Sequence, residues 1–134
     1  MAIWQVPIRF AFVQGGEVLR TKLAGTAELS AILPEEKSWS QKIKQYGSLD
    51  STCLEFYCDE GVVEEISARI DLRSITKQQV EGICAFAADN GFGILYKGKT
   101  YAPCWESFRM IVEDSDAHRF LADPEGFLSA LNKE

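Results

Sequence analysis

The sequence predicts an α+β fold in which residues 1–134 form a single domain, with an antiparallel sheet of two hairpins and an edge strand, and helices packed on one face. Three observations support this prediction. Hydrophobic residues alternate on both sides of a turn at residues 59–61, a helix with complete start and stop signals follows, and a second turn lies near Gly98. A chain of this length can bury about two thirds of its unfolded surface in one core.

The first predicted strand covers about residues 3–13. Its apolar residues Ile8, Phe10 and Phe12 alternate with Pro7 and Arg9, as in a strand with one buried face. Proline has no N–H to donate to a neighbouring strand, so we expect this strand at an edge of the sheet or with a bulge. The segment "VQGGE" then predicts a turn.

Residues 17–46 give weaker patterns. The segment "EVLRTKL" is compatible with a strand, and "TAELSAIL" with one or two helical turns. After Pro34, two glutamates suit a first helical turn, and Trp39, Ile43 and Tyr46 follow at helical spacing before Gly47. We therefore expect a short amphipathic helix between Pro34 and Gly47.

A hairpin is predicted around the turn "DEG". The alternating core-facing residues on its two sides are Leu54, Phe56, Cys58, Ile66, Ala68, Ile70 and Leu72. If Phe56 pairs with Ala68, Glu55 lies directly opposite Arg69, an opposite-charge pair that contributes about 0.2–1 kcal/mol. Asp71 and Arg73 extend the same polar face.

The segment "SITKQQVEGICAFAADNG" predicts a helix. Thr76 as N-cap and Gln79 three residues later form a capping box, and Ile75 can pack on Val80. Gly91 can adopt the left-handed conformation that ends a helix. The apolar stripe consists of Val80, Ile83, Cys84 and Ala87, which places Cys84 in the core.

The next segment, "FGILYKGKTYAP", predicts a second hairpin. Gly98 and Lys99 fit the central positions of a type II′ turn, which would place Tyr96 opposite Tyr101. A helix from about Trp105 follows, with Phe108, Ile111 and Val112 on one face.

The C-terminal stretch "EDSDAHRFLADPEGFLSAL" contains the one histidine of the chain. Asp114, Asp116 and His118 could bind a divalent metal or orient a general base. Helix chemistry explains them better, because Ser115 is a good N-cap, Asp116 suits the helix dipole and His118 occupies the reciprocal capping position. We therefore predict no metal site and no cofactor.

The same stretch predicts a last helix. Asp123 is its N-cap and Pro124 its first residue, and the inward-facing residues are Phe127, Leu128 and Leu131. Arg119 is the charged residue of this stretch with the least evident structural role.

The net charge of −6 is unevenly distributed. Between Lys44 and Arg69 there are six acidic residues and no lysine or arginine. This pattern excludes nonspecific nucleic-acid binding, which requires cationic side chains, and it favours a basic protein partner. The predicted contact residues, which we call the acidic hairpin surface, are Glu55, Tyr57, Asp59, Glu60, Glu64 and Glu65, with Trp39 as a further aromatic anchor.

The four cysteines, Cys53, Cys58, Cys84 and Cys104, lack the C-x-x-C spacing of zinc or redox sites. We expect free thiols in a reducing cytoplasm, of which Cys53, on the polar side of the hairpin, and Cys104, after Pro103, could be exposed. A catalytic cysteine would need His118, and no spacing selects one of the four cysteines for that role.

No apolar run approaches the roughly 20 residues of a membrane span, and the first residues lack the features of a signal peptide.

A charged strip on the hairpin is the second candidate site. Arg69, Asp71 and Arg73 lie beside Glu55 and could bind a small ligand, together with His118 and Arg119. Such strips are more often solvated ion pairs, because exposed pairs are common and individually weak. A pocket lined by these side chains would favour ligand binding.

The region from Trp39 to Leu131 resembles small bacterial α+β proteins that include the immunity proteins of polymorphic toxin systems. The matching features are Trp39 before Tyr46 and Gly47, the strand "ISARIDLR", and the ending "SDAHRFLADPEGFL". The resemblance covers about two thirds of the chain and brings no catalytic residues with it. It implies an intracellular bacterial protein that neutralises a toxin domain.

The sequence therefore favours a non-enzymatic protein-binding module that contacts a basic partner through the acidic hairpin surface. The alternatives are a ligand-binding protein or enzyme that uses the charged strip, and a structural subunit that self-associates.

Overall fold

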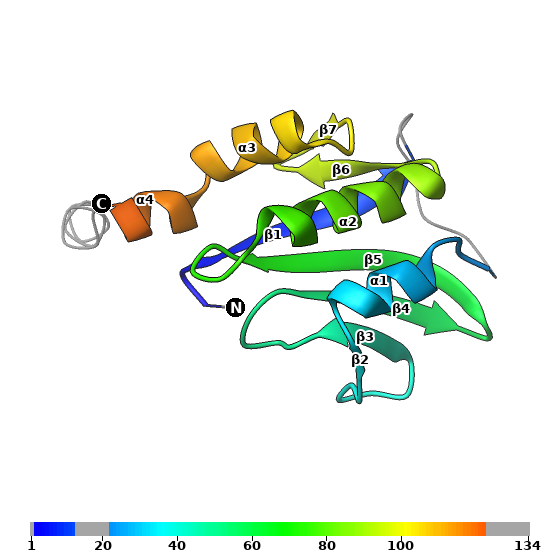
Figure 1. The fold of residues 1–134 in the computed structure, drawn as a ribbon. Helices are drawn as coiled ribbons and strands as arrows, with labels where there is room; N and C mark the ends of the chain where they lie inside the picture. Colours follow the sequence, from blue (N-terminus) through cyan, green and yellow to red (C-terminus); the bar gives the residue numbers. More distant parts are fainter. Residues whose placement is uncertain (1, 13–21, 123–134) are drawn as a thin grey trace.

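The computed structural model describes residues 2–12 and 22–122, and in this part of the chain seven strands and four helices form an α+β fold, as predicted (Figure 1). The strands form one antiparallel sheet in the order β2-β3-β4-β5-β1-β6-β7. In chain order the elements are β1 (Gln5–Phe12), α1 (Thr26–Ile32), β2 (Glu35–Glu36), β3 (Ile43–Gly47), β4 (Cys53–Asp59), β5 (Val62–Asp71), α2 (Lys77–Asp89), β6 (Phe92–Tyr96), β7 (Lys99–Tyr101), α3 (Trp105–Glu113) and α4 (Asp116–Ala122).

Helices α1, α2 and α3 cover one face of the sheet, and the hydrophobic core lies between them and the strands (Figure 1). Phe10, Phe56 and Phe86 meet at its centre, where the rings of Phe56 and Phe86 stack with centroids 5.7 Å apart. Helix α4 lies at one end of the sheet, beside the start of β1. Among the described residues no helix covers the opposite face, which we call the helix-free face.

The predicted edge position of the first strand is wrong, because β1 lies between β5 and β6. The Leu72 N–H donates to the Trp4 carbonyl, so even-numbered residues of β1 direct their backbone groups toward β5. The backbone of Pro7 therefore faces the other side, where pairing with β6 begins at Arg9. An interior strand tolerates Pro7 because its missing N–H falls outside that pairing.

The predicted helix after Pro34 is also wrong. Residues 35–36 and 43–47 form β2 and β3, which pair with each other, and β3 pairs with β4. Tyr46 points into the core, where its ring centroid lies 5.1 Å from that of Phe56. The helical spacing of Trp39, Ile43 and Tyr46 was a local signal that pairing of β3 with β2 and with β4, the next strand in the chain, outweighs. The helical turns predicted in "TAELSAIL" are confirmed as α1.

The central hairpin is confirmed as β4 and β5, but its register differs by two residues from the predicted one. Phe56 pairs with Ile66 and not with Ala68. Glu55 consequently lies diagonally across from Arg69, and the two side chains still form an ion pair with an N–O distance of 3.5 Å. The predicted charge pair therefore exists despite the different register.

A tight turn and a bulge set this register. Glu60 and Gly61 both have positive φ, as a two-residue type I′ turn requires. The register then shifts between Tyr57 and Cys58, which leaves Glu64 as the additional residue on β5. Both features lie at the tip of the acidic hairpin surface.

The second hairpin is confirmed as β6 and β7, with its turn one residue earlier than predicted. Lys97 and Gly98 are the central residues, both with positive φ. Tyr96 therefore pairs with Lys99, and Tyr101 pairs with Ile94. The type II′ turn and the Tyr96–Tyr101 pair are corrected accordingly.

The predicted N-caps Thr76 and Ser115 and the helix-ending conformation of Gly91 are confirmed. Thr76 and Gln79 form the complete capping box of α2, and Gly91 has a φ of 74°. The Ser115 hydroxyl accepts a hydrogen bond from the His118 backbone N–H at 3.2 Å, at the start of α4. The turn "VQGGE", the start of "EVLRTKL" and the predicted last helix lie wholly or mainly outside the described residues.

Candidate functional site

Buried polar side chains concentrate on the helix-free face of the sheet and at its margin. The cross-strand register places Gln45, Glu55 and Ser67 in one row on this face, with Arg9 next to them on β1. A buried polar group lowers stability unless it is hydrogen-bonded, so such a concentration requires an explanation. The buried polar residues of this region are Gln5, Gln45, Thr52, Glu55 and Asp71.

Glu55 is the centre of the first polar cluster. It is only 2% exposed, and its carboxylate accepts a hydrogen bond from the Trp39 indole Nε1 at 3.3 Å. Arg69 contacts the other carboxylate oxygen at 3.5 Å. Trp39 itself is 69% exposed. A buried carboxylate thus holds an exposed indole ring in place.

A buried acceptor lies next to this cluster. Gln45, which pairs with Glu55 across β3 and β4, donates its amide to the Gly47 carbonyl at 2.7 Å. Its Oε1 is buried and has no hydrogen-bond partner among the described residues. Gln45 therefore retains unused capacity to accept a hydrogen bond beside the Glu55 carboxylate.

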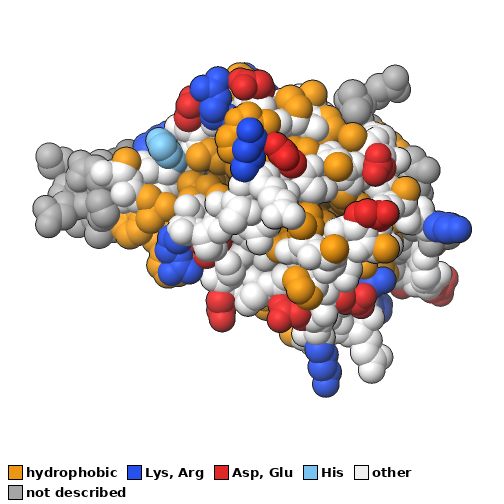
Figure 2. Space-filling view, in the orientation of Figure 1, with side chains coloured by type: hydrophobic (Ala, Val, Ile, Leu, Met, Phe, Trp, Pro, Cys, Tyr) orange, Lys and Arg blue, Asp and Glu red, His pale blue; other side chains and the backbone are white. Residues whose placement is uncertain are grey.

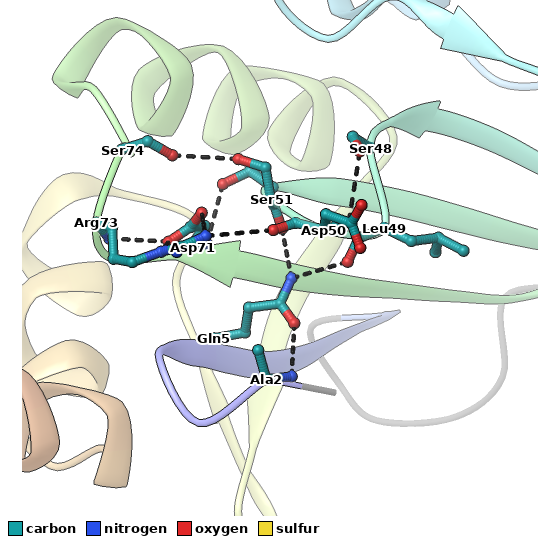
Figure 3. Close-up of polar contacts among 10 residues, drawn as sticks. Ala2, Gln5, Ser48, Leu49, Asp50, Ser51, Asp71, Arg73 and Ser74 are labelled. Atoms are coloured by element: carbon teal, nitrogen blue, oxygen red, sulfur yellow. Dashed lines mark hydrogen bonds and ion pairs between the residues drawn. The ribbon is translucent and has the colours of Figure 1, made fainter.

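Asp71 and Arg73 form the second polar cluster (Figure 3). The buried Asp71 carboxylate accepts hydrogen bonds from Arg73 Nε and Nη2, both at 3.1 Å, and from the Arg73 backbone N–H at 2.9 Å. Burial alone would raise the pKa of the Asp71 carboxyl, but the hydrogen bonds and the charge of Arg73 outweigh it and lower the pKa. Asp71 is therefore a carboxylate at neutral pH.

A loop and the chain's first residues complete this cluster. Gln5 donates to the Leu49 carbonyl at 3.1 Å and to that of Ser51, which ties β1 to the loop before β4 (Figure 3). The Arg73 guanidinium lies 3.9 Å from the centre of the Trp4 ring, a cation–π contact. A hollow of about 330 Å³ lies here, with both Arg69 and Arg73 in its wall. The charged strip predicted from the sequence therefore borders a pocket.

The acidic hairpin surface is only partly neutralised. Asp59 pairs with Lys42 at 3.9 Å, and Glu65 pairs with Arg9 at 3.0 Å. Glu60 and Glu64 are exposed, and among the described residues neither forms an ion pair. Tyr57 is half-buried on the helix-free face, next to Glu65 in the register. Of the six predicted contact residues, Glu55 is thus a buried support and the other five reach the surface to differing degrees.

His118 and Arg119 lie apart from this region. Arg119 pairs with Asp116 at 3.6 Å and donates to the Asp114 carbonyl at 3.3 Å. His118 lines an apolar hollow of about 420 Å³ between α3 and α4, whose wall contains neither Arg69 nor Arg73. Figure 2 shows hydrophobic side chains gathered beside these two helices. The structure therefore does not combine His118 and Arg119 with the charged strip.

The remaining candidates for chemistry are metal ligands and the four cysteine thiols. Among the described residues, no three histidine, cysteine or acidic side chains gather as metal ligands would. All four cysteines are free. Of the two cysteines that the sequence left as candidates for exposure, Cys104 is exposed and Cys53 is completely buried. Cys53 pairs with Arg69 in the register of β4 and β5.

Cys104 is expected to react with iodoacetamide faster than the other three thiols. A hydrogen bond with the Ser107 side chain, followed by backbone N–H groups at the start of α3, lowers its pKa. Burial raises the pKa of Cys53 and of Cys84 to about 11, so these thiols should react at least ~100-fold more slowly in the folded protein. Timed alkylation at pH 7.5 with peptide mass spectrometry measures the four rates. The C104S variant should lose the fast phase, and early labelling of Cys53 would contradict its burial beside Arg69.

No family model, curated protein or solved structure matches this chain. Within the described ranges, no helix has the length and hydropathy needed to cross a bilayer. The contacts and charges of the site's own residues are therefore the basis for assigning a function.

Proposed function

We propose that this protein is a non-enzymatic protein-binding module that recognises a basic partner through Trp39 and the acidic hairpin surface. The observation that carries the proposal is the environment of Trp39. This side chain has the highest exposure of the large hydrophobic residues that the structure describes as exposed, and its indole N–H is held by the buried Glu55 carboxylate. An exposed tryptophan with a fixed orientation is characteristic of an interface anchor.

The physical advantage of this arrangement is preorganisation. Binding normally costs about 0.5–1.5 kcal/mol for each side chain that becomes immobilised. The hydrogen bond to Glu55 restricts Trp39 before the partner arrives, and Arg69 holds Glu55 from the other side. A partner therefore meets a ring that is already positioned, and more of the apolar contact energy becomes affinity.

Charge supports a basic partner. Glu60 and Glu64 project from the hairpin tip without an ion pair among the described residues, and the whole chain carries a net charge of −6. The loop that contains Trp39 lies beside this hairpin, because the Cys58 N–H donates to the Lys42 carbonyl at 2.7 Å. Complementary charge accelerates encounter, and the aromatic anchor slows dissociation.

The specific form of the proposal is an immunity-type protein that neutralises a basic toxin domain in the bacterial cytoplasm. The resemblance in sequence motivates this form, and the four free thiols are compatible with a reducing compartment. The amino-acid composition of the partner tests this specific form of the proposal: a basic toxin domain has more lysine and arginine than acidic residues.

The W39A variant is expected to bind the partner at least ~30-fold more weakly than the wild type, because truncation of an interface tryptophan typically costs 2 kcal/mol or more. The partner is first captured from a lysate of the source organism with the wild-type protein and identified by mass spectrometry. Surface plasmon resonance with the purified partner then gives the affinities, and the association rate should fall between 50 mM and 500 mM salt.

The matched control is W105A, which removes an exposed tryptophan from α3 on the helix-covered side. It should leave the affinity unchanged. A partner that is not basic, or equal binding by W39A and the wild type, would show that this surface is not the interface. Circular dichroism of both variants separates loss of binding from loss of folding.

A further inference from the structure

We propose that the hollow between Arg69 and Arg73 is a binding site for a short aliphatic monocarboxylate. This site lies beside the proposed protein-binding surface and shares Arg69 with its support, but it requires no partner protein. The hollow has a volume of about 330 Å³, the low end of the range for small-molecule sites. Its wall consists of Ala2, Trp4, Gln5, Leu49, Asp50, Arg69 and Arg73.

Both guanidinium groups are paired with buried carboxylates that are not part of the wall of the hollow. Arg73 uses Nε and Nη2 for Asp71 and stacks on Trp4, and among the described residues its Nη1 has no acceptor. Arg69 uses Nη2 for Glu55 and keeps Nε and Nη1. Asp71 and Glu55 are each 2% exposed, so they position the arginines without competing inside the hollow.

The unused N–H groups select a planar anion. Nη1 of Arg69 and Nη1 of Arg73 can each donate to a different oxygen of one carboxylate, and each charge-assisted hydrogen bond is stronger than a neutral one. The wall of the hollow contains the basic residues Arg69 and Arg73 and the acidic residue Asp50, whose backbone carbonyl accepts a hydrogen bond from Arg73 Nη2 at 3.5 Å. Glu55 and Asp71 pair with the two arginines and are not part of the wall. Three acidic groups against two basic ones leave a net charge of −1, which weakens the binding of any anion and opposes a dianion such as phosphate about twice as strongly as a monocarboxylate.

The other walls define the remainder of the ligand. Trp4 and Leu49 supply apolar surface next to the arginines. A chain of a few methylene groups can lie on these side chains while the carboxylate meets the guanidinium groups. A hollow of this size leaves little room for more, so a free acid with about three to five carbons fits best.

The test is a titration of the ¹⁵N-labelled full-length protein with sodium butyrate at constant ionic strength, followed by NMR. We expect saturable shifts of the Trp4 indole and of the amide signals of Leu49, Asp50 and Arg73, with a Kd of roughly 1–10 mM. Butylamine and butanol are the matched probes without a carboxylate, and they should cause no such shifts. Shifts that are absent, scattered over the chain or equal for the three probes would overturn the proposal.

Two substitutions of exposed acids make the test independent of folding. D50N removes the negative charge that borders the hollow and should tighten butyrate binding about 3-fold. D59N makes the same charge change at the far end of β4 and should leave the Kd unchanged. An identical Kd in D50N and D59N would overturn the proposal.

The paired substitution E55Q/R69Q removes both charges together and avoids an unpaired buried carboxylate. It should weaken butyrate binding at least 10-fold while the NMR spectrum remains that of a folded protein. A folded E55Q/R69Q protein that binds butyrate as the wild type does would also overturn the proposal.

Discussion

Replacing Gly47 by alanine is expected to lower the free energy of unfolding by about 4 kcal/mol, measured by urea denaturation followed by circular dichroism. Gly47 ends β3 with a φ of +84°, a conformation that costs an L-residue about 1–2 kcal/mol. A Cβ atom there would also overlap the Thr52 carbonyl oxygen and press on the Cα of Cys53. Both obstacles are backbone atoms, so relief requires β3 to separate from β4.

Gly61 provides the control for G47A. It has a similar φ of +79°, but a Cβ atom at this position would meet no atom within 4 Å. The G61A variant should therefore lose about 1 kcal/mol, the conformational cost alone. The difference between G47A and G61A measures the steric contribution at β3. Equal losses in the two variants would mean that β3 and β4 do not approach each other as closely as the structure shows.

The D71N variant is expected to lose about 2–3 kcal/mol of unfolding free energy at pH 7. Asparagine keeps one acceptor oxygen, but it removes the charge that Arg73 meets through two nitrogen atoms. Hydrogen bonds to charged groups contribute about 1.5–3 kcal/mol each, and the Arg73 backbone N–H and Ser51 also depend on this carboxylate. Urea denaturation of D71N and the wild type measures the loss.

The effect of D71N should depend on pH in a defined direction. The pKa of Asp71 is lower in the folded protein than in the unfolded chain, so its carboxylate stabilises the fold fully above the unfolded value of about 3.9. This contribution is lost as the pH falls through the folded value. The difference between the wild type and D71N should therefore be constant from pH 5 to 8 and shrink below about pH 4.

The exposed Asp59 again offers a matched control. Its ion pair with Lys42 is long and solvent-exposed, so D59N should change the unfolding free energy by less than about 0.5 kcal/mol at any pH in this range. A wild-type-to-D71N difference that stays constant down to pH 2 would show that the Asp71 charge does not stabilise the fold.

The elements that the sequence predicted correctly are those with local signals. Thr76 and Gln79 mark the start of α2 by a reciprocal hydrogen bond between neighbours, and Ser115 caps α4 within three residues. The two hairpins likewise follow from alternation around a glycine turn. In each case the residues that form the cap or the turn lie close together in the chain, so the sequence alone is enough to predict the element.

The errors in element type and strand position occurred where pairing in the sheet decides. Residues 35–36 and 43–47 become strands because they pair with each other and because β3 pairs with β4, the next strand in the chain. β1 becomes interior because β5 and β6 flank it. These pairings cannot be inferred from the local pattern. Pro7 can lie in an interior strand because its side of β1 has no neighbour there: the pairing of β1 with β6 begins at Arg9.

The candidate site was predicted in part. Strand periodicity correctly placed Glu55, Arg69 and Asp71 on one face, and charge identified the acidic hairpin surface. Trp4 and Gln5 were missed, because Gln5 meets the Leu49 loop across 44 residues of sequence. The available signal was the polar alternation of Gln5 and Arg9 in the first strand, which becomes informative once that strand is known to adjoin β5.

Arg69 belongs to both polar clusters, since it contacts Glu55 beneath Trp39 and also borders the hollow. One side chain that serves two binding sites couples them thermodynamically. A carboxylate that binds the remaining N–H groups of Arg69 favours the position in which Nη2 also contacts Glu55, and this position supports the Trp39 ring. By reciprocity, a partner that fixes Trp39 and Glu55 holds Arg69 in place for the small ligand, so each ligand raises the affinity for the other. The protein would thereby report the concentration of a small acid as a change in how tightly it holds another protein.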